Sequence, residues 1–417
     1  MVLKKRLTKT FKIIDTSLFL LPLIFLFIPS INYESYVNST ITSKTLFFIY
    51  GLLFILSFYT LDIIFNKRSK FLFKLSRIEI SISIIFIFIV VNRYLIQLNF
   101  GFSIRFIELL GMGFLCVILR SLLFKSFIWL LLAIVISGII QAIYGNLQLL
   151  GYYPSNHSGF RLSGSFFNPG PYAGFLVSVF PIALGLYLFR EKIIKQLLVN
   201  VSTKRYFIIN TVIKFAVEYV PLLGIISILL VIPASQSRAS WLAILISSVL
   251  LFELRYQTIK KLFSKMNKTK KAILIIVSVL IIGISLLGVY HFKKESSDGR
   301  LFIWKTSTEI IKDNAFFGVG FDRFKKHYMN YQASYFVKFG ETEEALIADN
   351  TYYTFNEFLQ FIVENGIVGF IILMFVLFFI IKTAPIKENN ELSVIIKISL
   401  LTIGVFAFFS YSMEILF

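Results

Sequence analysis

The sequence predicts an all-α polytopic membrane protein of about eleven to twelve transmembrane helices with one large extramembrane loop. Of its 417 residues, 57% are hydrophobic and only 15% are charged. Apolar runs of about 18 residues or more recur, and each is long enough to cross a bilayer as a helix. Because backbone polar groups must be satisfied inside lipid, these runs are expected to be helical.

We expect eleven spans, with boundaries accurate to a few residues. They cover 14–31, 45–65, 78–97, 103–119, 127–150, 171–189, 216–234, 239–254, 272–290, 361–382 and 392–417. The first run follows a basic N-terminal segment without a small-residue cleavage motif, so we interpret it as an uncleaved helix. The segment 206–215 is too short to span and predicts a helix at the membrane interface.

The distribution of basic residues predicts the orientation. A net charge of +20 would suggest nucleic acid in a soluble protein, but cytoplasmic loops of membrane proteins are enriched in Lys and Arg, so no nucleic-acid partner is expected. With the N-terminus in the cytoplasm, the inner segments hold 27 Lys and Arg. The short outer loops hold only five: Lys44, Arg93, Arg105, Arg161 and Arg238. The single Cys116 excludes an intramolecular disulfide.

One segment, 291–360, breaks the apolar pattern with nine Lys or Arg and ten Asp or Glu. Long loops translocate largely regardless of charge, so this loop is expected outside. We divide the chain into N-terminal helices 1–150, central helices 151–290, the large loop 291–360 and C-terminal helices 361–417. Chemistry is expected at the loop and the short outer turns beside it.

Two of those turns contain arginine. RLSGSFFNPGPYAG (161–174) carries Asn168 just before a predicted helix start, whose free N–H groups favour an anion. SQSRASW (235–241) places Arg238 at the membrane edge, where a charged side chain indicates function. The alternatives are an ordinary turn for the first motif and an arginine that reaches lipid phosphates for the second.

The large loop contains a third motif, DGRLFIWKTSTEIIKDNAFFGVGFDRF (298–324). We expect a turn at Asp298-Gly299 and then an amphipathic helix lying on the membrane plane. Its apolar stripe is expected at Leu301, Trp304, Thr308 and Ile311. Gly318 and Gly320 form an elbow, which lacks the lysine of a phosphate-binding loop.

The fourth motif, NEFLQFIVENGIVGF (356–370), leads into the tenth span. Asn356, Gln360 and Glu364 are spaced by four and are expected on one helix face. A carboxylate at the bilayer boundary needs a partner, for which an outer arginine is the natural choice. A polar seam between two helices is the alternative.

Taken in order, the four motifs resemble the O-antigen ligase and polymerase family of bacterial membrane glycosyltransferases. The resemblance covers about 150–385 and implies a GT-C-like fold. It implies that the donor is a glycan on undecaprenyl pyrophosphate, at the periplasmic face of the inner membrane. The implied acceptor is lipid A core, a growing glycan or a protein hydroxyl, and neither a metal nor a cofactor is implied.

In this resemblance Arg161 and Arg238 occupy the positions that bind the pyrophosphate. Arginine suits phosphate oxygens, and stabilising charge on a departing group is usually a large catalytic contribution. Asn356 and Glu364 complete the expected catalytic group. Four further residues are expected to contact substrate: Asn168, Arg300, Trp304 and Gln360.

One position departs from the family pattern. Family ligases often carry His before an Asn, then nine residues and Gly-x-x-Gly; here Asn356, Gly366 and Gly369 fit, but Phe355 replaces the His. Because Phe cannot accept a proton, another base is needed, unless the acceptor requires little activation or the chain is a polymerase-like member. The candidates for that base are His327, Asp349 and Glu357.

Two interpretations without catalysis stay open, a glycolipid transporter and a non-catalytic subunit of an envelope assembly complex. Transporters tend to place charges near mid-membrane and to contain internal repeats. The clearest charges here lie at the outer edge, which favours the enzyme. The absent His keeps the second alternative open.

Overall fold

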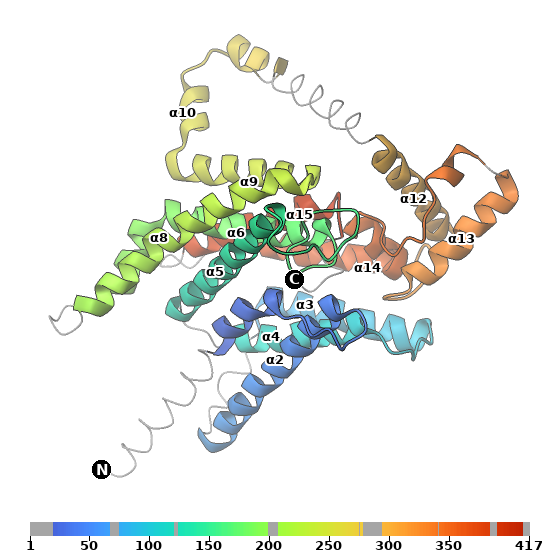
Figure 1. Ribbon diagram of the computed structural model, residues 1–417, viewed down its shortest axis with the longest axis horizontal. Helices are drawn as coiled ribbons and strands as arrows, with labels where there is room; N and C mark the ends of the chain where they lie inside the picture. Colours follow the sequence, from blue (N-terminus) through green and yellow to red (C-terminus); the bar gives the residue numbers. More distant parts are fainter. Residues whose placement is uncertain are drawn as a thin grey trace.

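The computed structural model describes residues 20–66, 75–120, 124–198, 207–274, 276–277, 294–340, 342–383 and 390–411, and within these ranges there is no strand (Figure 1). The helices are α2 (Ser39–Asn66), α3 (Arg77–Val91), α4 (Ile104–Arg120), α5 (Phe124–Leu149), α6 (Pro169–Leu188), α7 (Arg190–Leu198), α8 (Phe207–Val231), α9 (Arg238–Tyr256), α10 (Thr258–Ser264), α12 (Lys294–Asp313), α13 (Phe324–Phe339), α14 (Glu357–Lys382) and α15 (Asn390–Ala407). A π-helix, Asn92–Ile96, continues α3.

The fold class predicted from sequence is confirmed. Among the described residues, eight helices are long and apolar enough to cross a membrane, and each matches a predicted span. The predicted spans 14–31 and 103–119 correspond to shorter helices, Leu20–Ser30 within the described part and α4. The predicted span 272–290 lies almost entirely outside the described residues.

Three local predictions were wrong. Residues 207–215 do not form a separate interfacial helix but are the first part of α8, whose Glu218 pairs with Arg190 at 3.8 Å and is thereby accommodated within the longer helix. The last span ends at Ala407 rather than Phe417. The turn expected at Asp298-Gly299 lies inside α12, where a glycine costs only about 1 kcal/mol relative to alanine.

The apolar stripe of α12 is also displaced from the prediction. Leu301 is exposed, whereas Phe302, Ile303 and Ile310 are buried. The reason is that α12 packs against α13 and α14, and these helices rather than a membrane plane set its buried face. In Figure 1, α12 and α13 lie together beyond the end of α14.

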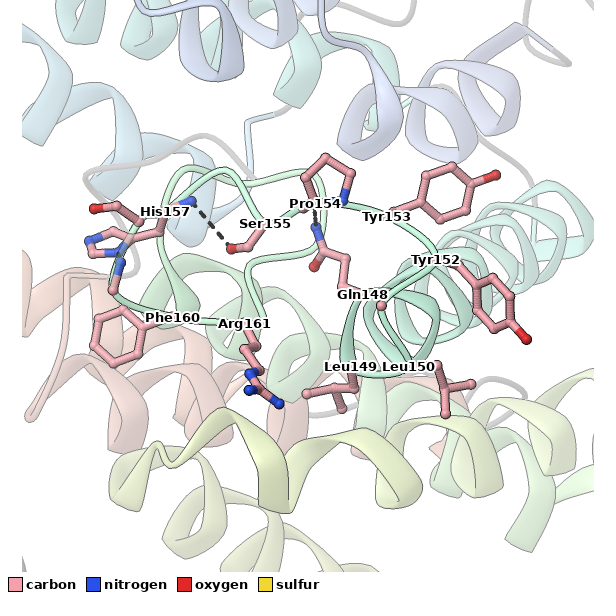
Figure 2. Close-up of a pocket in the computed structure, with 13 residues that line it drawn as sticks. Gln148, Leu149, Leu150, Tyr152, Tyr153, Pro154, Ser155, His157, Phe160 and Arg161 are labelled. Atoms are coloured by element: carbon pink, nitrogen blue, oxygen red, sulfur yellow. Dashed lines mark hydrogen bonds between the residues drawn. The ribbon is translucent and has the colours of Figure 1, made fainter.

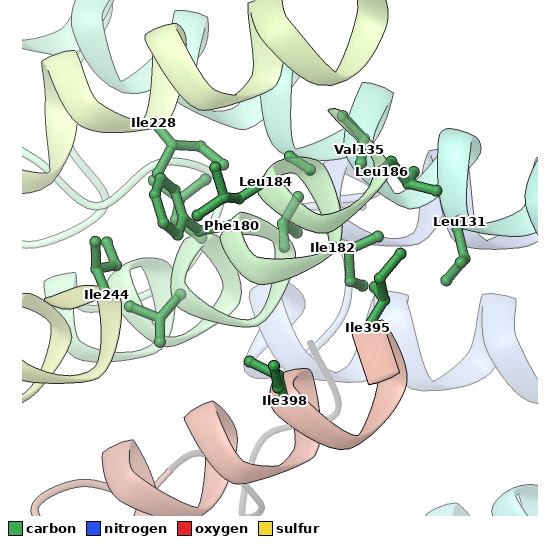
Figure 3. Packing of buried hydrophobic residues seen from close by; sticks show 14 of the residues in the cluster. Leu131, Val135, Phe180, Ile182, Leu184, Leu186, Ile228, Ile244, Ile395 and Ile398 are labelled. Carbon is green, nitrogen blue, oxygen red and sulfur yellow. The ribbon is translucent and has the colours of Figure 1, made fainter. Parts of the chain in front are cut away.

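The largest hydrophobic core surrounds α6, against which α5, α8, α9 and α15 pack (Figure 3). Leu176, Val177 and Ala183 of α6 are completely buried there. A second core, including Phe48 and Leu52, joins α2 and α4. A helix buried on all sides is apolar all round, which explains why α6 lacks a polar face.

Contacts between connecting segments show which of them lie at the same end of the helix bundle. Lys44 donates to Ser165 O at 2.7 Å, which brings the start of α2 to the loop before α6. At the opposite end, Lys192 of α7 pairs with Glu391 of α15 at 2.7 Å. We call the end formed by the starts of α2, α4, α6, α9 and α14 the outer end. It gathers the segments that the charge pattern predicted to lie outside.

Candidate active site

The first part of the candidate site is a pair of neighbouring guanidinium groups, which we call the arginine pair: Arg238 and Arg300. Arg238 is the first residue of α9, whose start is capped by Ser237. Its Nη2 donates to Ser297 Oγ of α12 at 3.1 Å, and Arg300 follows one helical turn later. Burial, and next the charge of Arg238, lower the pKa of Arg300 to about 10. Two like charges held together cost energy that a bound anion offsets.

Aromatic rings surround Arg300. Its guanidinium carbon lies 5.0 Å from the centre of the Phe355 ring, a distance suited to a cation–π contact. Its Nη1 donates to Phe409 O at 2.8 Å, just after α15 ends. Tyr411 packs edge-on against Phe355 at 5.2 Å and stacks on Tyr353 at 4.4 Å. The segment after the last span therefore forms one wall around the arginine pair.

Phe355 itself has a left-handed backbone, with φ of 57°. For a bulky residue this conformation costs roughly 1–2 kcal/mol. It is held because Asn356 begins α14, accepting from the backbone N–H groups of Phe358 and Leu359 at 3.1 Å. The position where the family carries a His is thus filled by a ring that contacts an arginine.

Two residues expected to touch substrate instead hold this segment by its backbone. Trp304 Nε1 donates to Thr354 O at 2.9 Å, and Thr354 N donates to Gln360 Oε1 at 3.0 Å. Gln360 is buried on the first turns of α14. In this structure Trp304 and Gln360 fix the position of Phe355 beside the arginine pair.

A second polar cluster surrounds Glu364, which is only 1% exposed. Its carboxylate accepts from Arg105 Nη1 at 3.1 Å, and Arg105 also reaches Asp322 at 3.5 Å. Asp322 in turn accepts a hydrogen bond from Ser103. The predicted outer arginine for Glu364 is therefore present, but it comes from α4 and not from the arginine pair.

Glycines bring two backbones together at this cluster. Gly366 kinks α14 with φ of 64°, and Gly320 N donates to Glu364 O at 2.8 Å. A Cβ on Gly318 would lie 2.5 Å from the Glu364 backbone, and one on Gly366 would lie 2.2 Å from Phe316 O. We call these contacts, with Arg105, Asp322 and Glu364, the Glu364 clasp.

The clasp is anchored on α3 as well. In the π-helix, Asn92 Nδ2 donates to Phe317 O at 2.8 Å, and Arg93, 1% exposed, donates Nη1 to Phe321 O at 3.2 Å. Just beyond it, Gln97 Nε2 donates to Gly318 O at 2.7 Å. A π-helix often marks a functional position, and here it turns three side chains toward one loop.

The region that contains the arginine pair and Glu364 matches a known family. Residues 222–374 match the family model described as O-antigen ligase. This part of the chain is an O-antigen ligase domain. It covers the last part of α8, all of α9, α12 and α13, and more than half of α14. No curated protein matches the chain.

Outside the matched region, the loop between α5 and α6 is firmly held. Gln148 Oε1 accepts from Ser163 N at 3.1 Å and from Gly164 N at 2.8 Å. The loop lines a pocket of about 890 Å³ (Figure 2). Arg161 is exposed at its edge, and Figure 2 shows its guanidinium pointing away from His157. Arg238 bonds to Ser297, one turn before Arg300, while Arg161 lies on this separate loop.

The same loop leads to the arginine pair through the start of α6. Asn168 lies just before this helix, as predicted, and caps it by accepting from Gly170 N at 3.1 Å. A Cβ on Gly170 would lie 3.1 Å from Tyr411 Oη, so the first turn of α6 adjoins the aromatic wall. Tyr411 follows the last span and carried no sequence signal that could have revealed this position.

The three candidate bases lie in different surroundings. Glu357, 7% exposed, is in the first turn of α14, two residues after Phe355. His327 lies on α13, where burial and then Arg323 and Lys326 lower its pKa. Asp349 is exposed and accepts from Asn350 N at 2.6 Å. Of the three, Glu357 is carried on the element that also positions Phe355. Among the described residues, no group of three or more His, Cys, Asp or Glu is arranged to hold a metal ion.

Proposed function

We propose that the chain transfers a glycan from undecaprenyl pyrophosphate to an acceptor at the periplasmic face of the inner membrane. The acceptor class is that of an O-antigen ligase, lipid A core or a comparable surface acceptor. The observation that carries the proposal is the arginine pair, in which Arg238 bonds to α12 one turn before Arg300, within the region that matches the O-antigen ligase family model.

The proposed chemistry follows from where charge develops. As the bond between the anomeric carbon and the phosphate oxygen breaks, negative charge grows on the pyrophosphate. Arg238 and Arg300 stabilise this charge, and Arg161 approaches from its own loop to complete the anion site. Guanidinium groups bind phosphate oxygens bidentately, and preorganised charge costs no rearrangement during the reaction.

The acceptor hydroxyl attacks the anomeric carbon and loses its proton. Asn356 and the large loop are proposed to position the acceptor, with Glu357, His327 or Asp349 as base. The isoprenoid tail of the donor lies between the spans, among apolar side chains of the outer end.

Phe355 favours a second candidate, a surface polysaccharide polymerase of the same family. The ring replaces the residue that ligases of the family often use as base, and it contacts Arg300 instead. In a polymerase the acceptor is the end of another lipid-linked repeat unit. Both candidates use the same donor and the same arginine pair.

Deletion of the gene in its native host, followed by analysis of surface glycans, tests the proposal. Polymer accumulating on its lipid carrier identifies a ligase, and single repeat units on the core identify a polymerase. Unchanged surface glycans would contradict both. Complementation with Arg238→Ala or Arg300→Ala should fail, whereas complementation with the wild-type chain should succeed.

A further inference from the structure

We propose that Tyr411 is a substrate-binding residue whose hydroxyl donates a hydrogen bond to the pyrophosphate held by the arginine pair. This inference rests on the proposed function. It extends the site from the O-antigen ligase domain to the short segment that follows the last described span, which the family match does not include.

The first observation is a hydroxyl without a protein partner on a largely buried ring. Tyr411 is 6% exposed. Within the described part of the chain, no hydrogen bond to its Oη is formed, and the oxygen is not among the fully buried polar atoms. The hydroxyl is therefore open to a ligand. Burial also raises the pKa of this phenol, so the hydroxyl keeps its proton and acts as a donor.

The second observation is that the Tyr411 ring is fixed in place. It stacks almost parallel on Tyr353, with an interplanar angle of 5°, and meets Phe355 edge-on. Phe409 O accepts from Arg300 at 2.8 Å two residues earlier. The segment is therefore tied both to α12 and to the turn before α14, and the hydroxyl has a defined position.

The third observation is the direction of the hydroxyl. A Cβ built on Gly170 would lie 3.1 Å from Tyr411 Oη and 3.5 Å from Cζ, so the hydroxyl reaches the first turn of α6. Pro169 and Pro171 have no N–H and Gly170 N already donates to Asn168, so the first turn of α6 contributes the positive end of its dipole and not free N–H groups. Arg300 lies close enough to affect the titration of Tyr411.

Positive potential from three sources thus converges on one unpartnered donor. A carbohydrate hydroxyl would not require this much positive charge, whereas the oxygens of a diphosphate would. Recognition of a diphosphate by two guanidinium groups leaves further oxygens to be satisfied, and the Tyr411 hydroxyl supplies one donor for them.

The test measures binding of undecaprenyl pyrophosphate and of inorganic pyrophosphate to the purified full-length protein in detergent. Tyr411→Phe removes only the hydroxyl and keeps the ring stack. We expect about tenfold weaker binding of both probes, as for loss of one hydrogen bond to a charged group. Tyr352→Phe, the same change on the exposed neighbouring ring, should leave both affinities unchanged.

The outcomes separate this inference from the proposed function. If Arg238→Ala loses binding while Tyr411→Phe binds both probes like the wild type, the inference fails and the proposed function stands. Weaker binding of the lipid alone would place the hydroxyl on another part of the donor and also overturn it. If the wild type binds neither probe, both fail.

A second pair of variants tests the position of the hydroxyl. With Tyr411 present, the methyl of Gly170→Ala meets Oη at 3.1 Å, a tight contact; in Tyr411→Phe the nearest ring atom is at 3.5 Å, an ordinary one. Gly170→Ala should therefore weaken binding more in the wild type than in Tyr411→Phe. Equal losses in the two backgrounds would overturn the placement.

Discussion

At the outer end of the molecule arginine occurs in two settings. Arg105 meets two carboxylates, Glu364 and Asp322, within the clasp. Arg300 instead meets a carbonyl oxygen, an aromatic ring and a second arginine. A neutralised arginine holds elements together, whereas an arginine beside another cation is prepared for an anion from outside. We propose from this contrast that the first setting is structural and that the second binds substrate.

The two settings are connected by α14. The Phe355 ring and the Asn356 cap face the arginine pair, and Glu364, two turns further along, belongs to the clasp. The kink at Gly366 lets the loop after α12 pair with the α14 backbone. The clasp therefore fixes the position of α12, and with it Arg300, relative to the membrane helices.

The proposed difference between the two arginine settings is tested most directly by removing charge from the arginine pair. Arg238→Ala, Arg300→Ala and Arg161→Ala should each lower transfer by about 10²–10³-fold, the usual effect of losing one donor to a developing anion. Each protein should remain inserted and melt like the wild type. The measurement is glycan transfer by purified protein. Arg255→Ala at the opposite end is the matched control; equal losses there, or wild-type transfer by the three variants, would contradict the assignment.

Substitutions in the Glu364 clasp should mainly lower the stability of the fold, whereas those in the arginine pair mainly lower transfer. Arg105→Ala leaves the buried Glu364 carboxylate without its partner and should destabilise the fold by about 3–5 kcal/mol. Glu364→Gln leaves Arg105 paired with Asp322 and should cost less, but more than the loss of an exposed pair. Transfer should weaken only through displacement of α12. Thermal unfolding in detergent measures the first effect.

A matched control for the clasp is Glu79→Gln. Glu79 pairs with Arg120 at 3.2 Å where both side chains are partly exposed, so its loss should cost about 1 kcal/mol or less. A melting temperature of Glu364→Gln that equals that of Glu79→Gln would remove the clasp from its structural role.

Much of this arrangement could be predicted from sequence, because lipid imposes a simple rule. The apolar runs predicted the fold class, and loops that the charge pattern assigned to one side of the membrane lie at one end of the molecule. The Asn168 cap and the need of Glu364 for an outer arginine also followed from local rules. Their signals lie within a few residues or in one buried charge.

The remainder depends on contacts between distant segments. Nothing near Glu364 in sequence identified Arg105, 259 positions away, over any other outer arginine. Likewise, the sequence around Tyr411 looks like part of an apolar run, and only its ring stack on Tyr353 shows that it lies beside the turn before α14. The bond from Arg238 to Ser297, which brings Arg238 near Arg300 on the next turn of α12, also joins segments that are far apart in the sequence.

A milder substitution tests the structural role proposed for the Glu364 clasp. Gly318→Ala puts a methyl 2.5 Å from the α14 backbone at a residue with φ of 66°, so either the loop or the helix must shift. We expect a loss of stability of about 1–3 kcal/mol. Gly340→Ala is the control, since Gly340 has φ of 74° but open space around it. Equal losses would attribute the effect to backbone conformation alone and not to the clasp.

The smallest expected effect concerns divalent metal ions. In the proposed mechanism the arginine pair supplies the positive charge that a metal supplies in other phosphate-handling sites, so EDTA should change the transfer rate less than about twofold. The assay is glycan transfer by the purified protein with and without the chelator, and with Mg²⁺ restored. Activity that falls with EDTA and returns with the ion would mean that two guanidinium groups are not sufficient at this end. The distinction between the two arginine settings would then need a third, metal-dependent component.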